Sequence, residues 1–140
     1  MLLGPKSKKL KKSFIRRPTL FDQTVKPSLT FGSVGLVALQ PGRINARQIE
    51  ATRKVLRRLL RKEAKTWITI FPQMPLTKKP QEVRMGKGKG NIKYWVCLVK
   101  KGQVLYESQG ISPYSINKAF FFAKKKLSLK SKICVNSMLC

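Results

Sequence analysis

The chain has 140 residues, of which 31 are lysine or arginine and only 5 are aspartate or glutamate, giving a formal net charge of +26. A compact domain with this excess repels itself, so the composition favours a polyanionic partner. Nucleic acid is the first candidate, because each phosphate contact releases condensed counterions. An anionic membrane surface is the second. Histidine is absent, which removes the commonest general base and the commonest metal ligand.

Hydrophobic residues make up 42% of the chain, enough for a core, and the length suits one domain. No apolar run approaches the roughly 20 residues that span a bilayer. The cysteines Cys97, Cys134 and Cys140 form no close pair, which favours a reducing compartment over a disulfide framework. We expect no metal and no other cofactor. The lysine-rich start, interrupted by Pro5, is typical of mature protein rather than of a cleaved leader.

Residues 1–28 are basic and contain three prolines. We expect them to form an extended arm with few contacts of its own, which becomes ordered on a polyanion; a flexible, solvated tail is the alternative. Residues 29–140 are expected to form a single α+β domain. Its first element is a strand over residues 31–40, in which Gly32 and Gly35 indicate a bulge or a close approach. A turn follows at Pro41-Gly42.

The clearest helix is predicted over residues 46–65. Asn45 suits the N-cap, and Gln48 follows three residues later, as in a capping box. The apolar positions at helical spacing share one face: Ile49, Val55, Leu56, Leu59 and Leu60. Basic side chains cover much of the remaining circumference with few acids nearby. We therefore expect a phosphate-facing surface rather than an ordinary solvated helix face.

A strand is predicted over residues 66–71, where Trp67 and Phe71 are expected to serve core or cross-strand packing. Residues 72–91 predict a long loop, and loops of this length in compact domains are commonly functional. Its end, residues 84–90, alternates glycine with lysine. Glycine permits conformations and close approaches that side chains block, while the lysines place charge along the backbone, which suits a phosphate ribbon. The spacing matches neither a Walker A loop nor a dinucleotide fingerprint, and an unstructured basic turn is the alternative.

Residues 93–99 and 103–108 predict two strands joined as a β-hairpin. A second helix begins at Pro113, with Ser112 as its N-cap. Its apolar positions at helical spacing face a core: Ile116, Ala119, Phe120, Ala123 and Leu127. One of its remaining phenylalanines, Phe121 or Phe122, is expected to contact the sheet or a partner. A last strand is predicted over residues 132–135.

Several motifs together resemble a known family. The most specific is Val83-Arg84-Met85-Gly86-Lys87-Gly88-Lys89-Gly90-Asn91, followed by Tyr94-Trp95-Val96 and then by Gly102 and Val104-Leu105-Tyr106-Glu107. The stretches before it are Met1-Leu2 with Pro5-Lys6, Phe31-Gly32-Ser33 with Gly35-Leu36, Gly42-Arg43 with residues 46–51, and Trp67-Ile68 with Phe71-Pro72, Pro75, Thr77, Lys78 and Pro80. With these motifs the chain resembles, over nearly its whole length, the sixteenth protein of the bacterial-type large ribosomal subunit.

The resemblance implies an α+β fold, with two main helices on an antiparallel or mixed sheet, and a structural, non-enzymatic constituent of the large subunit that binds its ribosomal RNA. It also implies that the glycine–lysine loop approaches the tRNA-binding and peptidyl-transferase region, with transfer RNA and neighbouring large-subunit proteins as partners. Arg84 matches an arginine that is hydroxylated in some bacterial members. The candidate RNA-binding residues are Lys6, Lys8, Lys9, Lys11, Lys12, Arg16, Arg17, Arg43, Arg47, Arg53, Arg57, Arg58, Arg61, Arg84, Met85, Gly86, Lys87, Gly88, Lys89, Gly90 and Asn91.

The family pattern is poorly matched over residues 13–29 and in the lysine- and phenylalanine-rich region from residue 120 onward. This drift, with a start that lacks a presequence, predicts an organelle-encoded copy in a mitochondrial ribosome on the matrix side; a plastid or bacterial ribosome is the alternative. Two other functions stay open, an extraribosomal basic RNA-binding protein and a protein of anionic membrane surfaces. An enzyme is disfavoured, because the carboxylates are scattered singly along the sequence.

Overall fold

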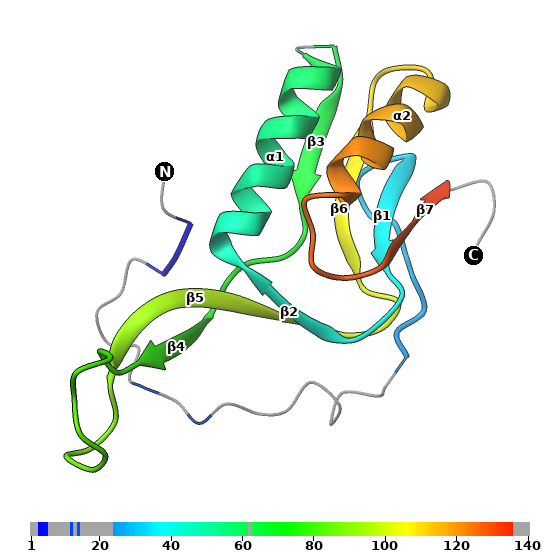
Figure 1. Ribbon diagram of the computed structural model, residues 1–140. Coiled ribbons are helices and arrows are strands. Elements are labelled where there is room, and N and C mark those ends of the chain that lie inside the picture. Colours follow the sequence, from blue (N-terminus) through cyan, green and yellow to red (C-terminus); the bar gives the residue numbers. More distant parts are fainter. Residues whose placement is uncertain (1–2, 6–11, 13, 15–23, 62, 136–140) are drawn as a thin grey trace.

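The computed structural model describes residues 3–5, 12, 14, 24–61 and 63–135. In these residues two helices pack with two antiparallel sheets, one with the strand order β3-β6-β1-β7 and the other β2-β5-β4 (Figure 1). The elements are β1 (Val34–Ala38), β2 (Gly42–Asn45), α1 (Ala46–Leu60), β3 (Lys65–Ile68), β4 (Met74–Lys78), β5 (Asn91–Val99), β6 (Val104–Gln109), α2 (Pro113–Lys124) and β7 (Ser131–Val135). The predicted α+β class is confirmed, with two sheets in place of one.

The helices and the three-stranded sheet extend in different directions from the four-stranded sheet. Helices α1 and α2 pack against each other and reach its strands β1 and β3. Strand β2 runs directly into α1, and Asn45 is both its last residue and the N-cap of the helix. The amide of Asn45 donates to Oε1 of Gln48 at 2.9 Å, as the predicted capping box requires. The β4–β5 hairpin points away from both helices (Figure 1).

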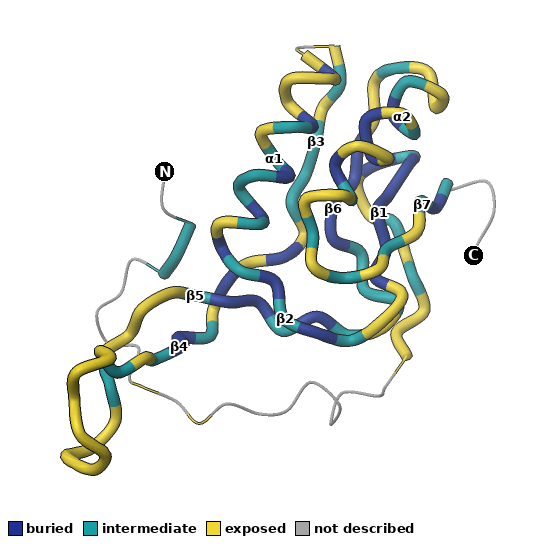
Figure 2. The backbone as a smooth tube through the Cα atoms, in the orientation of Figure 1, coloured by how far each residue is buried: buried dark blue, intermediate teal, exposed yellow. Residues whose placement is uncertain are grey.

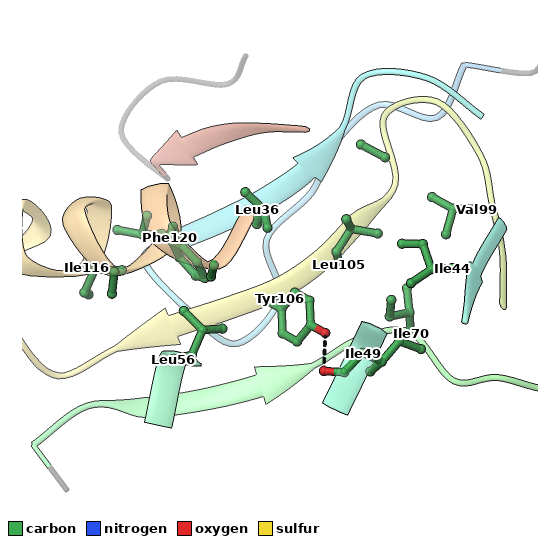
Figure 3. Packing of buried hydrophobic residues seen from close by; sticks show 14 of the residues in the cluster. Leu36, Ile44, Ile49, Leu56, Ile70, Val99, Leu105, Tyr106, Ile116 and Phe120 are labelled. Atoms are coloured by element: carbon green, nitrogen blue, oxygen red, sulfur yellow. Dashed lines mark hydrogen bonds between the residues drawn. The ribbon is translucent and has the colours of Figure 1, made fainter. Parts of the chain in front are cut away.

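The core lies where the helices meet the four-stranded sheet (Figure 3). Fully buried side chains come from every layer: Leu36 of β1, Leu56 of α1, Leu105 of β6 and Phe120 of α2. Tyr106 adds a polar link, because its hydroxyl donates to the carbonyl oxygen of Ile49 at 2.9 Å and so joins β6 to α1. Burial raises the pKa of this phenol well above its ordinary value, which keeps it neutral and able to donate.

The predicted hairpin between residues 93–99 and 103–108 is wrong. Both strands exist, but β5 pairs with β2 and β4, whereas β6 pairs with β1 and β3. The reason lies in the connecting turn, whose amides bond to β1. The amide of Gly102 donates to the carbonyl of Ala38 at 2.8 Å, and the carbonyl of Gln103 accepts from the Ala38 amide at 3.0 Å. The chain therefore crosses from one sheet to the other instead of folding back on itself.

Strands β2 and β4 replace segments that were predicted as a turn and as a loop. Gly42 opens β2 rather than closing a turn, and the loop expected over residues 72–91 is interrupted by β4. Pro75 lies within β4 opposite Trp95; β4 is an edge strand, where proline is tolerated because no ladder donor is needed on its outer side. The connecting loop that remains runs over residues 79–90.

Helix α1 is shorter than predicted and its buried face is narrower. It ends at Leu60 rather than at residue 65, because Arg61 takes a left-handed φ of 51°. Leu59, predicted to widen the apolar face, is 44% exposed, whereas Thr52 is buried and donates to the carbonyl of Gln48 at 2.9 Å. The strand expected over residues 66–71 likewise ends at Ile68. The predicted second helix and last strand are confirmed as α2 and β7.

The buried carboxylate of Glu107 anchors the chain that enters β1. It accepts hydrogen bonds from three consecutive amides: Thr30 at 3.1 Å, Phe31 at 2.6 Å and Gly32 at 2.8 Å. The close approach predicted for Gly32 is confirmed, because a Cβ there would lie 2.8 Å from backbone atoms of Ser108. The ring of Phe31 stacks on Trp67 of β3, with ring centres 6.0 Å apart. Trp67 thus has the packing role expected of it.

Glu107→Gln tests this anchor. The amide side chain keeps the shape but removes the charge and turns one acceptor into a donor that faces N–H groups. We expect a loss of about 2 kcal/mol in the free energy of unfolding, the range for hydrogen bonds to charged groups. Urea titration should show a lower midpoint with an unchanged slope. The matched control is Glu82→Gln, at an exposed carboxylate. Equal midpoints for the two variants would contradict the assignment.

Candidate nucleic-acid interface

The loop over residues 79–90, here called the hairpin loop, projects at the end of β4 and β5. Residues 81–89 are all exposed, and Figure 2 shows the loop reaching away from the buried body. Gly86, Lys87 and Gly88 have φ values of 93°, 52° and 79°, in the left-handed region that favours glycine. A Cβ on Gly86 or Gly88 would meet nothing within 4 Å. These two glycines therefore serve the backbone conformation of the tip and leave it open to a ligand.

Gly90 has a different role, at the base of the hairpin. A Cβ there would lie 2.8 Å from the carbonyl carbon and oxygen of Lys78 and 2.9 Å from the nitrogen of Lys79. The loop can close only because this position has no side chain. Lys79 also donates its ammonium group to the carbonyl oxygen of Gly86, which holds the tip back toward the base. The glycine–lysine segment is thus a shaped loop rather than an unstructured basic turn.

The arm and the hairpin loop touch each other. Nζ of Lys12 donates to the carbonyl oxygen of Lys89 at 3.0 Å, and Nζ of Lys89 lies 4.9 Å from the centre of the Phe14 ring. Two segments that the sequence suggested as separate nucleic-acid contacts therefore form one surface. In the loop, Glu82 is the only acidic residue, so this surface is almost wholly cationic.

Other described parts of the arm also contact the domain. Gly4 lies against Trp95, since a Cβ built on Gly4 would be 3.2 Å from Cδ1 of the indole ring. The amide of Val25 donates to the carbonyl oxygen of Lys101 at 2.9 Å. At these positions the arm lies against the domain. The arm candidates that lie outside the described residues are Lys6, Lys8, Lys9, Lys11, Arg16 and Arg17.

Helix α1 presents a stripe of exposed cations. Arg47, Lys54 and Arg58 recur at spacings of seven and four residues, which places them on one face of the helix, opposite its buried side chains. Arg57 beside them and Arg61 at the helix end are also exposed. The stripe from residue 47 to residue 58 is about 16 Å long. Lys54 belongs to the basic circumference predicted to face phosphate, although it is absent from the list of candidate RNA-binding residues.

Two of the predicted arginines are less available than the others. Arg53 makes an ion pair with Glu50, with an N···O distance of 2.7 Å. The hydrogen bond from Arg53 lowers the pKa of the Glu50 carboxyl and raises that of the guanidinium, so both stay charged and largely neutralise each other. Arg43 lies on β2 and is partly buried.

The structure brings Arg47 close to the base of the hairpin and leaves the other helix cations farther away. A cavity of about 290 Å³ lies between the start of the arm, the start of α1 and β5. Its lining residues are Leu3, Gly4, Pro5, Asn45, Ala46, Arg47, Lys93, Tyr94 and Trp95. Arg57, Arg58 and Arg61 lie at the opposite end of α1. Lys79 and Lys93, near the ends of the hairpin loop, were missed, because only the fold shows that they flank it.

In the described part of the chain no three histidine, cysteine, aspartate or glutamate side chains gather where a metal ion could bind. Neither described helix is long and apolar enough to cross a membrane. The family described as "Ribosomal protein L16p/L10e" matches residues 5–134. The chain belongs to this family. It is therefore a non-enzymatic structural component of the large ribosomal subunit that binds ribosomal RNA.

Gly90→Ala tests how this ribosomal protein closes its hairpin loop. The new methyl group would press on the Lys78 backbone, an overpacking worth about 1–3 kcal/mol locally. Amide hydrogen exchange at the loop end of β4 and β5 should accelerate by roughly tenfold to hundredfold. Gly88→Ala is the control, because it adds strain at the open tip without touching the strands. Equal acceleration in both variants would show that tip strain, not the contact with Lys78, governs the hairpin.

Proposed function

We propose that the hairpin loop, the arm over residues 1–28 and the exposed cations of α1 are the surfaces that bind ribosomal RNA, and that residues 29–140 act as one RNA-binding domain. The observation that carries this proposal is the contact between arm and loop. Lys12 and Phe14 meet Lys89 at the base of an exposed, glycine-shaped loop that presents lysines in alternation. Such a surface follows a phosphate backbone without reading base sequence.

The charge of the chain supports many phosphate contacts. With +26 on 140 residues, the free protein carries strong self-repulsion that a polyanion relieves. Two of the three proposed surfaces lie on elements with their own hydrogen bonds: α1 carries the helix cations, and the β4–β5 ladder carries the loop. Fixed elements place these charges before RNA arrives, so fewer side chains and backbone segments lose freedom on binding.

For the loop we propose a finer role, as a contact of the tRNA-binding and peptidyl-transferase region. Its support is the family motif over residues 83–91 together with its shape. The tip is far from the core, has open space where a Cβ on Gly86 or Gly88 would lie, and carries the 95% exposed Met85 (Figure 2). We also propose a mitochondrial ribosome as its compartment, supported by the departure of residues 13–29 and of the C-terminal region from the family pattern. Sedimentation of extracts from purified mitochondria, plastids and cytosol tests this assignment; large subunits from another compartment carrying the chain would contradict it.

The double variant Lys87→Ala/Lys89→Ala tests the loop assignment. Removing two phosphate-contacting cations should weaken binding to large-subunit RNA evenly across sequences, and should lower the slope of log affinity against log salt concentration by about two units. The measurement is binding of the full chain to that RNA over a series of salt concentrations.

The matched control is Lys87→Arg/Lys89→Arg, which keeps both charges and should keep the wild-type slope. A double alanine variant with unchanged slope and unchanged assembly into large subunits would refute the role of the loop in phosphate binding.

A further inference from the structure

A groove of about 390 Å³ lies between α2 and β7. Both elements lie away from the hairpin loop (Figure 1). Its lining residues are Tyr114, Asn117, Lys118, Phe121, Ile133 and Val135. Four of these residues lie on α2. Asn117, Lys118 and Phe121 follow Tyr114 by three, four and seven residues, so all four share one face of the helix. This face lies opposite the buried one, which carries Ile116, Ala119 and Ala123. Helix α2 thus has one apolar face in the core and a second aromatic face on the surface.

The aromatic rings of this second face are available to a ligand. Tyr114 is 77% exposed and Phe121 is 47% exposed. Asn117 adds a polar group, since its Oδ1 has no hydrogen-bond partner among the described residues. Rotation of this amide about its last torsion would present either a donor or an acceptor to a molecule in the groove. A flat ring beside an amide is a suitable surface for a planar, hydrogen-bonding ligand.

The charged side chains of α2 and β7, the two elements that line the groove, are all lysines. Residues 108–140 contain six lysines and no aspartate or glutamate. Nζ of Lys124 lies 4.8 Å from the centre of the Phe121 ring, and Nζ of Lys125 lies 4.9 Å from it. Ammonium groups bond more strongly to phosphate oxygens than to an aromatic face at an exposed site. A phosphate chain would therefore draw these lysines off the ring and leave the ring face open.

Strand addition by another protein suits this edge less well. Strand β7 is the outermost strand of its sheet, but it carries the exposed Lys132 and follows Lys130. Lysines on an edge strand oppose pairing with a further strand. The complementary ligand is one that is anionic along its chain and carries planar groups, which is single-stranded RNA.

We propose that the groove between α2 and β7 holds an unpaired nucleotide of RNA, with its base on the ring of Phe121 and the neighbouring phosphates on Lys118, Lys124 and Lys125. The proposal rests on the RNA-binding role described above and adds a second contact, one that recognises unpaired nucleotides rather than phosphate alone. Aromatic side chains flanked by cations bind unpaired bases in this way.

The test uses the full chain and an unstructured single-stranded RNA of about 12 nucleotides, within the site sizes of single-strand-binding proteins. Phe121→Leu should weaken binding by roughly tenfold, the effect of losing one stacked base, without changing the salt slope because no charge is removed. Phe121→Trp, with a larger ring, should bind at least as tightly as the wild type. Ultraviolet cross-linking should place a nucleotide on the peptide that contains residues 114–121.

Phe122→Leu is the matched control, because Phe122 is 44% exposed on the same helix but does not line the groove. Its affinity should stay within twofold of the wild type. Equal effects of Phe121→Leu and Phe122→Leu, or no effect of either, would overturn the proposal. So would a cross-link from the groove to a neighbouring protein that survives ribonuclease treatment of intact large subunits.

The experiments distinguish an error in the groove proposal from an error in the assignment of the RNA-binding surfaces. If Phe121→Leu binds like the wild type while Lys87→Ala/Lys89→Ala still lowers the salt slope, the loop assignment stands and the groove proposal falls. If the wild-type chain itself shows no salt-dependent affinity for RNA, the assignment of the RNA-binding surfaces falls with it.

Discussion

The carboxylate of Glu107 is the interaction on which the arrangement of arm and domain depends. It lies buried in the central strand β6 and is held by the amides of residues 30–32. A buried anion is costly unless it is fully hydrogen-bonded, and consecutive amides supply those bonds without drawing in a cation. The chain that leaves the arm is thereby fixed where it enters β1.

The fold separates stability from binding. Most of the large buried side chains lie between the two helices and the four-stranded sheet, whereas the three-stranded sheet carries the exposed hairpin loop. Tyr106 links β6 to α1, and Asn45 links the second sheet to the same helix. The hairpin loop and the helix cations thus each stand on a hydrogen-bonded element. The self-repulsion of the charges acts mainly at the periphery, where solvent and salt screen it.

The sequence was sufficient for the local elements and insufficient for their pairing. The capping box at Asn45 correctly placed the start of α1, and Gly32 correctly indicated a close approach of the backbone. The apolar spacing in α2 correctly identified its buried face. These features act within a few residues of the chain. The partners of β5 and β6 were predicted wrongly, since bonds from Gly102 and Gln103 to Ala38 span more than 60 residues of chain. The periodicity of the helix was enough to place Lys54 on its basic circumference. The meeting of Lys12 with Lys89 could not, because no local pattern encodes it.

The direct passage of β2 into α1 has a consequence for how the protein assembles with its RNA. Because β2 also pairs with β5, the hairpin and the helix move as one body. On the RNA-binding surfaces proposed above, a loop that has engaged one RNA segment confines the helix cations near a second segment at a high effective concentration, because their translational freedom has already been lost. Avidity of this kind depends on the angle between hairpin and helix. Under that proposal, the strand pairing at residues 42–45 sets which two RNA segments this protein can hold together.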